Sequence, residues 1–596
     1  MSIPYTPPLR DMQFALFELA GLEEIAKLPG LADSDRETLI AVLEEAGRFG
    51  SEVLAPVNAI GDQQGTRVEG KNVIPAEGFD AAYRAFVAAG WQSLPFDPAR
   101  GGQGLPVLLS TAVNEIWLSS NMAFSLCCML TLGAVTTIET HASAALKDRF
   151  LRKLISGEWT ATMDLTEPQA GSDLAAVKTR AERAGDHYLI TGQKIFITWG
   201  DQDFSENIIH LVLARLPDGP PGIKGISLFL VPKFLVKEDG GIGARNDFYP
   251  VSVEHKLGIR GSPTCVMSFG DQGGAVGYLI GREHEGIGCM FTMMNHARID
   301  VGLQGLGNSE RAFRLALAYA KERVQGTSPG QPGRVTIIRH PDVRRMLMLM
   351  KAGTEAMRAF AYSTTATLDR IHHDPDPEAR AWHETRCALL TPVLKGWCTE
   401  LGQELCSLGV QVHGGMGYIE ETGAAQFLRD VRITNIFEGT TGIQAMDLVG
   451  RKVIKDNARA LNELIAEMQA VSTQLAGLHI EGYAQSQGHF LAGIAVLTKA
   501  RDWLLANYTA DINAPGAVCF NFLMLLGTVC GAWQMNRAAI IAKSKVDVGE
   551  DPDGFYRAKL VTARFYGEHF TPRVHGYFQT LCAGSESIMA LAEEEF

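Results

Sequence analysis

The chain has 596 residues, which exceeds what one hydrophobic core can organise and is enough for three or four domains. Its composition, 46% hydrophobic and 20% charged, is typical of a globular protein and excludes a large disordered part. The formal net charge of −13 argues against a nucleic-acid backbone as the main partner.

Residues 1–160 predict an N-terminal arm followed by a helical domain. Apolar residues recur there at spacings of three and four, the period of an amphipathic helix. The first twelve residues hold three prolines and no apolar core, so they do not predict a signal peptide. The predicted helices are 11–28, 35–54, 78–89, 111–120 and 143–155, with a Gly/Pro-rich loop over 91–105.

Residues 161–280 predict a central antiparallel β domain. Short runs rich in β-branched and aromatic residues alternate there with Gly, Asp and Pro. Asp186 and Gly192 mark the expected turns of the first hairpin. The predicted strands include 188–191, 194–198, 208–214 and 226–232.

Residues 281–455 predict a bundle of long helices, and residues 456–596 predict an additional helical domain. Three helices in the first region are expected to exceed the usual length of about 11–12 residues, and such lengths fit an antiparallel bundle. A loop rich in Gly and Pro, 325–334, separates the first two of them. The long helices are 289–324, 341–372 and 378–412, and later helices are expected to start near residues 456, 483, 515 and 551.

Two uncharged runs, 117–138 and 512–536, are long enough to resemble membrane spans. Both carry polar residues that are costly in lipid, such as Asn121 in the first and Gln534 in the second. We therefore predict buried helices and no membrane span. The ten cysteines form no CxxC pair and no Cys/His cluster with zinc spacing, which predicts reduced thiols in a cytoplasmic protein and no metal site.

One carboxylate, Glu438, stands in a setting that suits a base. Phe437 precedes it and Gly439 follows, so the side chain can point into an apolar cavity while the glycine lets a ligand approach the backbone. Apolar surroundings make a carboxylate a better proton acceptor near neutral pH. The alternative, which this stretch alone favours, is an ordinary helix N-terminus with Thr440 or Thr441 as a local cap.

Four other stretches have side chains suited to a ligand. Small residues and hydroxyls within 163–173 leave donors for phosphate oxygens, although a plain turn fits equally well. The strand 195–200 ends in an aromatic and a hydroxyl that can cover a planar ring, although an edge strand is the simpler interpretation. The stretch 296–298 ends in Arg298, and an arginine on a helix is usually solvated or in a salt bridge. The adjacent glycines within 411–417 allow a ligand to approach the backbone closely, or they form a helix C-cap.

Taken together, in this order and with this α–β–α succession, the motifs resemble those of the acyl-CoA dehydrogenase family over about residues 40–455. The extra N-terminal arm and the region after 456 are similar to the larger bacterial branch that includes 3-methylmercaptopropionyl-CoA dehydrogenases. The resemblance implies an α+β fold with an N-terminal helical domain, a central antiparallel β domain, a C-terminal four-helix bundle and an extra C-terminal helical domain. The motifs are T-E-P-x-A-G-S-D from Thr166, G-x-K-x-F-I-T from Gly192, Q-x-x-G-G-x-G-Y from Gln411 and F-E-G-T from Phe437.

The resemblance implies FAD-dependent α,β-dehydrogenation of an acyl-CoA thioester to a trans-2-enoyl-CoA. Glu438 matches the general base, a hydride passes to flavin N5, and an electron-transfer flavoprotein takes the electrons. The acyl group is either a fatty acyl chain or 3-methylmercaptopropionyl. Some branches carry the base on the first long helix, but that position is Ala297 here, so Glu438 is the only candidate.

The family's binding positions carry over residue by residue. Arg323, His340 and the Gln411 motif match positions that reach the FAD of a neighbouring subunit, which implies at least a homodimer. The expanded loop 325–334, Gly442 and Trp199 depart from the usual pattern. The implied FAD-binding residues are Leu165, Thr166, Ser172, Phe196, Thr198, Arg323, His340, Gln411, Gly414, Gly415 and Thr440. The implied substrate-binding residues are Ser172, Arg298 and Gly439.

Two alternatives remain open at this point. An acyl-CoA oxidase would share every motif and pass its electrons to oxygen. A DNA-binding flavoprotein relative would need a strongly basic C-terminal region, whereas residues 456–596 mix acids and bases and end in an acidic run. The additional domain carries no chemical motif, and we expect it to replace contacts between dimers, so that the protein is a dimer and not a tetramer.

Overall fold

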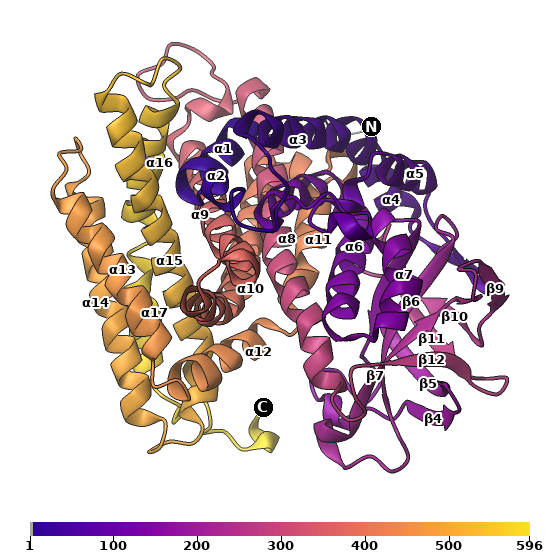
Figure 1. Ribbon diagram of the computed structural model, residues 1–596. Helices are drawn as coiled ribbons and strands as arrows, with labels where there is room; N and C mark the ends of the chain where they lie inside the picture. The colour runs from indigo at the N-terminus through magenta and orange to yellow at the C-terminus, as the bar shows by residue number, and fades with distance from the viewer. Residues whose placement is uncertain (1–3) are drawn as a thin grey trace. The chain divides into compact units, whose positions relative to one another are not determined.

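Residues 4–596 are described by the computed structural model (Figure 1), and they divide into two units. Unit 1 contains residues 4–7, Ala41–Pro106 and Ile116–Asp300. Unit 2 contains Pro8–Ile40, Val107–Glu115 and Val301–Phe596. Each unit is therefore assembled from segments that are far apart in the sequence.

Unit 1 is built on an eight-stranded sheet with the order β10-β11-β5-β12-β7-β6-β3, in which β4 pairs with both β5 and β6. The domain is confirmed, but the sheet is mixed, because β6 runs parallel to β3 and, at one residue pair, to β4. A parallel partner needs a crossover and cannot follow from a tight hairpin. The strands are β3 (Trp159–Asp164), β4 (Arg180–Ala184), β5 (His187–Thr198), β6 (Asn207–Arg215), β7 (Ile226–Pro232), β10 (Phe248–Val253), β11 (Thr264–Phe269) and β12 (Ala275–Ile280).

The predicted turn at Gly192 is wrong. Strand β5 passes through this residue without a break, and the hairpin with β4 turns at Gly185 and Asp186. A Cβ atom at Gly192 would lie 2.6 Å from the Oγ1 atom of Thr179. The glycine is thus required by a close approach within the sheet, which the sequence cannot distinguish from a turn.

Helices and two small hairpins complete unit 1. Helix α7 packs against β3, and β1 pairs with β2 as β8 does with β9. Trp199, at the end of β5, is buried; its Nε1 atom donates to the carbonyl of Ala123 on α6 at 3.0 Å. This side chain therefore belongs to the core. The elements are α4 (Ala55–Gln64), β1 (Arg67–Glu69), β2 (Asn72–Ile74), α5 (Phe79–Ala88), most of α6 (Val107–His141), α7 (Ala144–Ser156), β8 (Phe234–Val236) and β9 (Ile242–Arg245).

Unit 2 is a bundle of long helices in which α9 lies along α10 and α15 packs against α9, α10, α16 and α17 (Figure 1). The three long predicted helices are confirmed, and so are the four starts after residue 456; α17 was not predicted. The helices are α8 (Gly286–Glu322, which begins in unit 1), α9 (Pro341–His373), α10 (Pro377–His413), α11 (Ala424–Val431), α12 (Thr441–Met446), α13 (Arg459–Ala476), α14 (Ala484–Asn507), α15 (Ala514–Asp547), α16 (Phe555–His569) and α17 (Arg573–Cys582).

The N-terminal arm is less regular than predicted. In place of one helix over 11–28, the chain forms α1 (Leu9–Gln13), a π-helical stretch (Phe14–Leu19) and α2 (Leu22–Ile25). Gly21 has a φ of 73° and interrupts the helical path. The π-helical stretch packs against α9 and α15, so the first residues of unit 2 are tied to its centre and to the region after residue 456. Helix α3 (Arg36–Phe49) likewise ends in a π-helical stretch.

Both apolar runs form long helices inside the protein. By length and composition alone α6 and α15 could cross a membrane, but 89% and 78% of their most apolar windows are buried within the structure. The prediction of buried helices is confirmed for these two segments.

A buried group of charges joins five elements of unit 2. The Arg358 guanidinium on α9 donates from Nε and Nη2 to Glu115 of α6 at 2.9 and 2.6 Å, and from Nη2 to Glu310 of α8 at 2.7 Å. Its Nη1 atom pairs with Asp11 of α1, and the same carboxylate pairs with Lys559 of α16. The side chain of Arg358 is 1% exposed, so its charge is balanced by protein carboxylates and not by water.

Asp369 of α9 is a further buried carboxylate and lies at the start of α6. It accepts the backbone N–H groups of Val107 at 2.7 Å and Leu108 at 2.9 Å. Burial outweighs these two hydrogen bonds and raises the pKa of Asp369 to about 6. A carboxyl whose pKa is higher in the folded state stabilises most below its unfolded pKa, and the contribution disappears as pH rises through the folded pKa.

We therefore expect Asp369→Asn to flatten the pH dependence of stability. In the wild-type protein, ionisation of Asp369 should lower the free energy of unfolding by about 3 kcal/mol as pH rises from below 4 to above 6, because the folded and unfolded pKa values differ by about two units. The variant cannot ionise and should lose this slope. Thermal unfolding at pH 4.5, 5.5 and 7 measures it. Identical slopes in the two proteins would contradict the assignment.

Candidate active site

The loop that follows β3 is anchored to β5 by a buried ion pair. The Lys194 Nζ atom donates to Glu167 Oε1 at 2.9 Å and to the carbonyl of Leu165 at 3.0 Å, and both charged side chains are buried. The N–H of Ile195 donates to the carbonyl of Thr166 at 2.9 Å. The structure thus brings Leu165 and Thr166, which were predicted to contact the flavin, beside the strand that carries the next motif.

Glu167 and Lys194 each stand inside a quoted motif, but the sequence did not single them out. Burial alone would raise the pKa of Glu167, but the charge of Lys194 and the hydrogen bonds from Thr179 and Lys178 outweigh it and hold the pKa at about 2. The carboxylate is therefore ionised at neutral pH. Its role is to fix the loop, since it points into protein donors and not into open space.

We expect Lys194→Met to lower the FAD content of the purified protein. The change leaves the Glu167 carboxylate buried without its counter-charge, which typically costs about 3–5 kcal/mol. The ratio of flavin to protein absorbance measures the loss. Lys178→Met is the matched control, because only the backbone N–H of that exposed residue reaches Glu167. Adding Glu167→Gln to Lys194→Met should recover part of the flavin, because no unpaired charge is then buried. A Lys194→Met protein with the full wild-type flavin content would contradict the role of this ion pair.

Phe196 lies in a bulge of β5. Two β5 residues, Ile195 and Phe196, face one residue of β11, because the register shifts between Lys194 and Ile197. Phe196 has a φ of 59°, and its side chain is 58% exposed. A left-handed conformation costs a non-glycine residue about 1–3 kcal/mol, and bulges commonly re-aim side chains beside active sites. A large aromatic ring is therefore presented outward at an energetic cost.

Thr198 and Ser172 complete the predicted residues on this sheet. Thr198 is half-buried, and its carbonyl accepts the Thr162 hydroxyl at 2.6 Å. Ser172 is exposed in the loop after β3, next to Gly171, where a Cβ atom would meet nothing within 4 Å. The loop surface around Ser172 is thus open, whereas Thr198 is fixed.

Arg298 lies on the part of α8 that belongs to unit 1 and is 9% exposed. Its Nη1 atom donates to Asn295 Oδ1 at 3.2 Å, and its guanidinium lies 5.7 Å from the centre of the Phe291 ring. Ala297 beside it is buried, and the nearby His296 ring pairs with Asp300 at 3.1 Å. Position 297 therefore offers no base.

Glu438, in unit 2, stands in a strained turn. It is half-buried with a φ of 57°, and Gly439 follows with a φ of 90°. Thr440 then caps α12, its hydroxyl accepting the N–H of Ile443 at 3.2 Å, as the alternative interpretation expected of a local cap. Glu438 itself precedes the cap and lies outside the helix. Strain of this kind clusters at functional positions.

The remaining predicted residues lie at the ends of α8, α9 and α10 in unit 2. Arg323 is exposed. His340 occupies the N-cap position of α9 without a side-chain capping hydrogen bond, and its Nε2 atom lies 2.8 Å from the carbonyl of Gln325. Gln411 at the end of α10 is exposed too. Gly414 and Gly415 are exposed, and a Cβ atom at either would meet nothing within 4 Å.

His413, which the sequence did not single out, fixes this end of α10. Its ring stacks on Tyr319 of α8 with 4.6 Å between the centres, and its Nδ1 atom lies 2.7 Å from the carbonyl of Gly409. The segment that follows exposes Met416, Tyr418 and Ile419, the tyrosine at 85%. Three large apolar side chains in one short exposed segment are typical of a surface that another molecule covers.

Comparison with known families accounts for almost the whole chain. Residues 36–158, 162–272 and 284–454 match the N-terminal, middle and C-terminal domains of acyl-CoA dehydrogenases, and residues 445–592 match a domain described as acetyl-CoA dehydrogenase C-terminal like. The chain is 44% identical to a 3-methylmercaptopropionyl-CoA dehydrogenase of Ruegeria pomeroyi, over 95% of each chain. The chain belongs to the acyl-CoA dehydrogenase family.

Further relatives of this acyl-CoA dehydrogenase agree in length and fold. A butyryl-CoA dehydrogenase of Syntrophomonas wolfei is 34% identical over 99% of each chain. A Bacillus anthracis acyl-CoA dehydrogenase solved with FAD superposes with a TM-score of 0.73 at 21% identity, covering 94% of this chain and 90% of the other. The predicted fold class, including the extra C-terminal helical domain, is confirmed, except that the sheet of the β domain is mixed and not purely antiparallel.

As an acyl-CoA dehydrogenase the protein is an FAD-dependent oxidoreductase. The residues present fit a flat ring system. Phe196 is exposed and held outward in a bulge, half-buried Thr198 is two residues away, and Leu165 is pinned to the same strand through its carbonyl. An exposed aromatic face beside fixed polar groups is suited to stacking and edge recognition.

Proposed function

We propose that Glu438 is the general base that removes the α-proton of the acyl-CoA thioester. The observation that carries this proposal is its position in a left-handed turn directly before Gly439, while Ala297 replaces the only other family position for a base. The backbone N–H of Glu438 donates to the thioester carbonyl and stabilises the charge that develops on its oxygen. Gly439 and Arg298 contact the substrate, and Ser172 lies on the path of its phosphate-bearing tail.

FAD, when bound, would supply the two-electron oxidant that removes the β-hydrogen of the substrate as a hydride. Leu165 and Thr166 would hold the pyrimidine end of the ring system, Phe196 would cover the ring, and Thr198 would hold its redox-active part. Thr440 also contacts the cofactor. Arg323, His340, Gln411, Gly414 and Gly415 bind the FAD of a neighbouring subunit, a role supported by the exposure of the glycines.

We propose a short acyl group as the substrate, either a straight chain or the 3-methylmercaptopropionyl group, with trans-2-enoyl-CoA as the product. Two relatives that match nearly the full chain act, by their names, on 3-methylmercaptopropionyl-CoA and butyryl-CoA. The test is a series of acyl-CoAs from four to sixteen carbons plus 3-methylmercaptopropionyl-CoA, with ferrocenium as acceptor. A kcat/KM maximum at long chains would refute the short-chain assignment.

Electron-transfer flavoprotein is the proposed acceptor, and the reaction belongs to acyl-CoA oxidation in the cytoplasm. The alternative, an acyl-CoA oxidase, differs only in passing electrons to oxygen. Turnover without added acceptor, together with stoichiometric peroxide, would establish the oxidase. Turnover that needs electron-transfer flavoprotein supports the dehydrogenase.

We expect light scattering to give the mass of a dimer of 64.7 kDa chains. The exposed segment with Met416, Tyr418 and Ile419 supports contact with a second subunit. Residues 456–596 pack on α9 and α10 of their own chain and so occupy surface that would otherwise be available to another pair of subunits. A tetramer would contradict this role of the additional region.

A further inference from the structure

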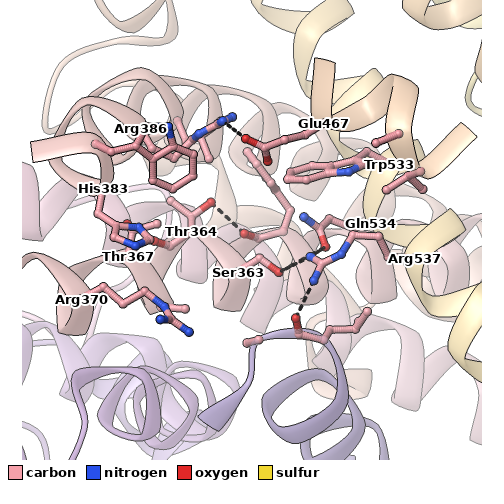
Figure 2. Close-up of a pocket in the computed structure, with 18 residues that line it drawn as sticks. Ser363, Thr364, Thr367, Arg370, His383, Arg386, Glu467, Trp533, Gln534 and Arg537 are labelled. Atoms are coloured by element: carbon pink, nitrogen blue, oxygen red, sulfur yellow. Dashed lines mark hydrogen bonds and ion pairs between the residues drawn. The ribbon is translucent and has the colours of Figure 1, made fainter. Parts of the chain in front are cut away.

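A cavity of about 390 Å³ lies within unit 2, where the N-terminal arm, α9, α10, α13 and α15 meet (Figure 2). None of the residues proposed above for FAD or acyl-CoA lines it. Its volume falls in the range of sites for small organic ligands. The region after residue 456, which carries no sequence motif, contributes a third of the lining, from α13 and α15.

The lining carries an excess of positive charge. The lining holds three arginines, Arg370, Arg386 and Arg537, and one carboxylate, Glu467, which forms an ion pair with Arg386. Within the described part of the chain, no carboxylate lies within 4.0 Å of the other two guanidinium groups. Arg537 donates instead to neutral acceptors, among them Gln534 Oε1 at 2.8 Å. Burial lowers the pKa of His383. Three arginines outnumber the one carboxylate, so the net charge of the lining is positive.

Several buried donors on residues that line the cavity lack a partner among the described residues, and these atoms have almost no accessible surface, so they lie behind the cavity wall. They are the Gln534 Nε2, Arg386 Nη1 and Trp533 Nε1 atoms, on side chains that are nine-tenths or more buried. A buried donor without an acceptor costs about 1–3 kcal/mol. Figure 2 shows Gln534 and Arg537 side by side, opposite Arg386 across the cavity. The accessible donors of the wall are therefore those of Arg370 and Arg537, which are half-buried.

The rest of the wall is apolar. Aromatic and aliphatic side chains, including Trp382, Phe360, Leu390 and Val471, make up much of the lining. Trp382 is 39% exposed, so one side of the cavity adjoins solvent. Inorganic phosphate would satisfy the charges but leave these side chains in contact with water. An anion with an apolar body satisfies both parts of the wall.

We propose that this cavity binds a small organic monocarboxylate, whose carboxylate accepts hydrogen bonds from Arg537 and whose body packs against the apolar wall. Arg370 supplies a second positive charge. The additional C-terminal region of the chain, together with the N-terminal arm and the α9–α10 pair, forms the binding site. Binding here links these segments, because Arg537 also donates to the carbonyl of Leu19 in the arm at 2.8 Å.

Isothermal titration of the FAD-loaded enzyme with hexanoate tests the proposal, with hexan-1-ol and inorganic phosphate as the other probes. Hexanoate should bind saturably, one per chain. Hexan-1-ol should bind at least about tenfold more weakly, because it lacks the charge that the arginines recognise. Phosphate binding as tight as hexanoate would show an inorganic-anion site and overturn the assignment, as would the lack of a saturable signal up to about 10 mM hexanoate.

Variants separate this cavity from the acyl-CoA site. Arg370→Gln and Arg537→Gln should each weaken hexanoate binding at least about tenfold. Ala470→Trp fills the cavity without removing a charge and should abolish binding, which keeps the test valid if loss of the Arg537 contact to the arm unfolds that variant. Arg459→Gln, an exposed change on the same helix as Glu467, is the control and should bind like wild type. Wild-type affinity in Arg370→Gln and Ala470→Trp would overturn the proposal.

Discussion

Glu438→Gln is expected to lower the rate of α,β-dehydrogenation by at least about a hundredfold, the low end for loss of a general base. The amide is nearly the same size as the carboxylate, so the strained turn and the cap of α12 by Thr440 should persist. What disappears is the ability to accept the α-proton. Steady-state rates with ferrocenium measure the loss, and the flavin absorbance spectrum shows whether FAD and acyl-CoA still bind.

The pattern of the loss distinguishes chemistry from folding. A base that acts only on the reacting carbon should reduce kcat while the affinity for acyl-CoA changes little. Glu421→Gln, an exposed carboxylate before α11, is the matched control and should keep wild-type kcat. If Glu438→Gln turned over at wild-type rates, Glu438 would not be the base.

Arg358→Met is expected to destabilise unit 2 by about 3–5 kcal/mol, the typical cost of breaking a buried ion pair from one side. The substitution leaves Glu115 and Glu310 buried without the charge that balances them. Asp11 would keep only Lys559. Removal of a partner is costly because the remaining charges must be desolvated without compensation.

Scanning calorimetry should show the loss as a lower unfolding temperature for the transition of unit 2. Arg345→Met is the control on the same helix, because that arginine pairs with Asp342 at the surface, where ion pairs contribute at most about 1 kcal/mol. Equal shifts in the two variants would mean that the buried group contributes no more than a surface pair. The charged residues of the buried group would then contribute to stability independently and not as a coupled network.

The sequence predicted the elements well where a single period ran for many residues. The helices α8, α9 and α10 are long and strongly patterned, and their observed ends lie within a few residues of the predicted ones. Gly192 and Gly21 show the limit. Gly192 allows a close approach to Thr179 in the middle of a strand, whereas Gly21 interrupts the helical arm. In the sequence both are single glycines inside a regular pattern, so their roles cannot be told apart there.

For the candidate site, motif residues could be located from the sequence, but their supports could not. Lys194 lies in a motif, yet only the structure shows that its charge is matched by Glu167 and that it fixes Leu165. Arg358 and Glu115 are 243 positions apart, and no local pattern announces such a pairing. The cavity of Figure 2 is hidden for the same reason, because its arginines come from three different helices.

The pairing of Asp11 with Lys559 spans 548 positions of the chain. During synthesis the ribosome releases the first helix long before its ammonium partner exists. Unit 1 ends at Asp300, so it can fold while the rest of the chain is still being synthesised. Helix α1 cannot complete its contacts until almost the whole chain has been synthesised. A nascent chain arrested before α16 would therefore contain the Asp11–Arg358 ion pair but not the Asp11–Lys559 ion pair. We expect its N-terminal arm to be more open to proteases than the arm of the full chain.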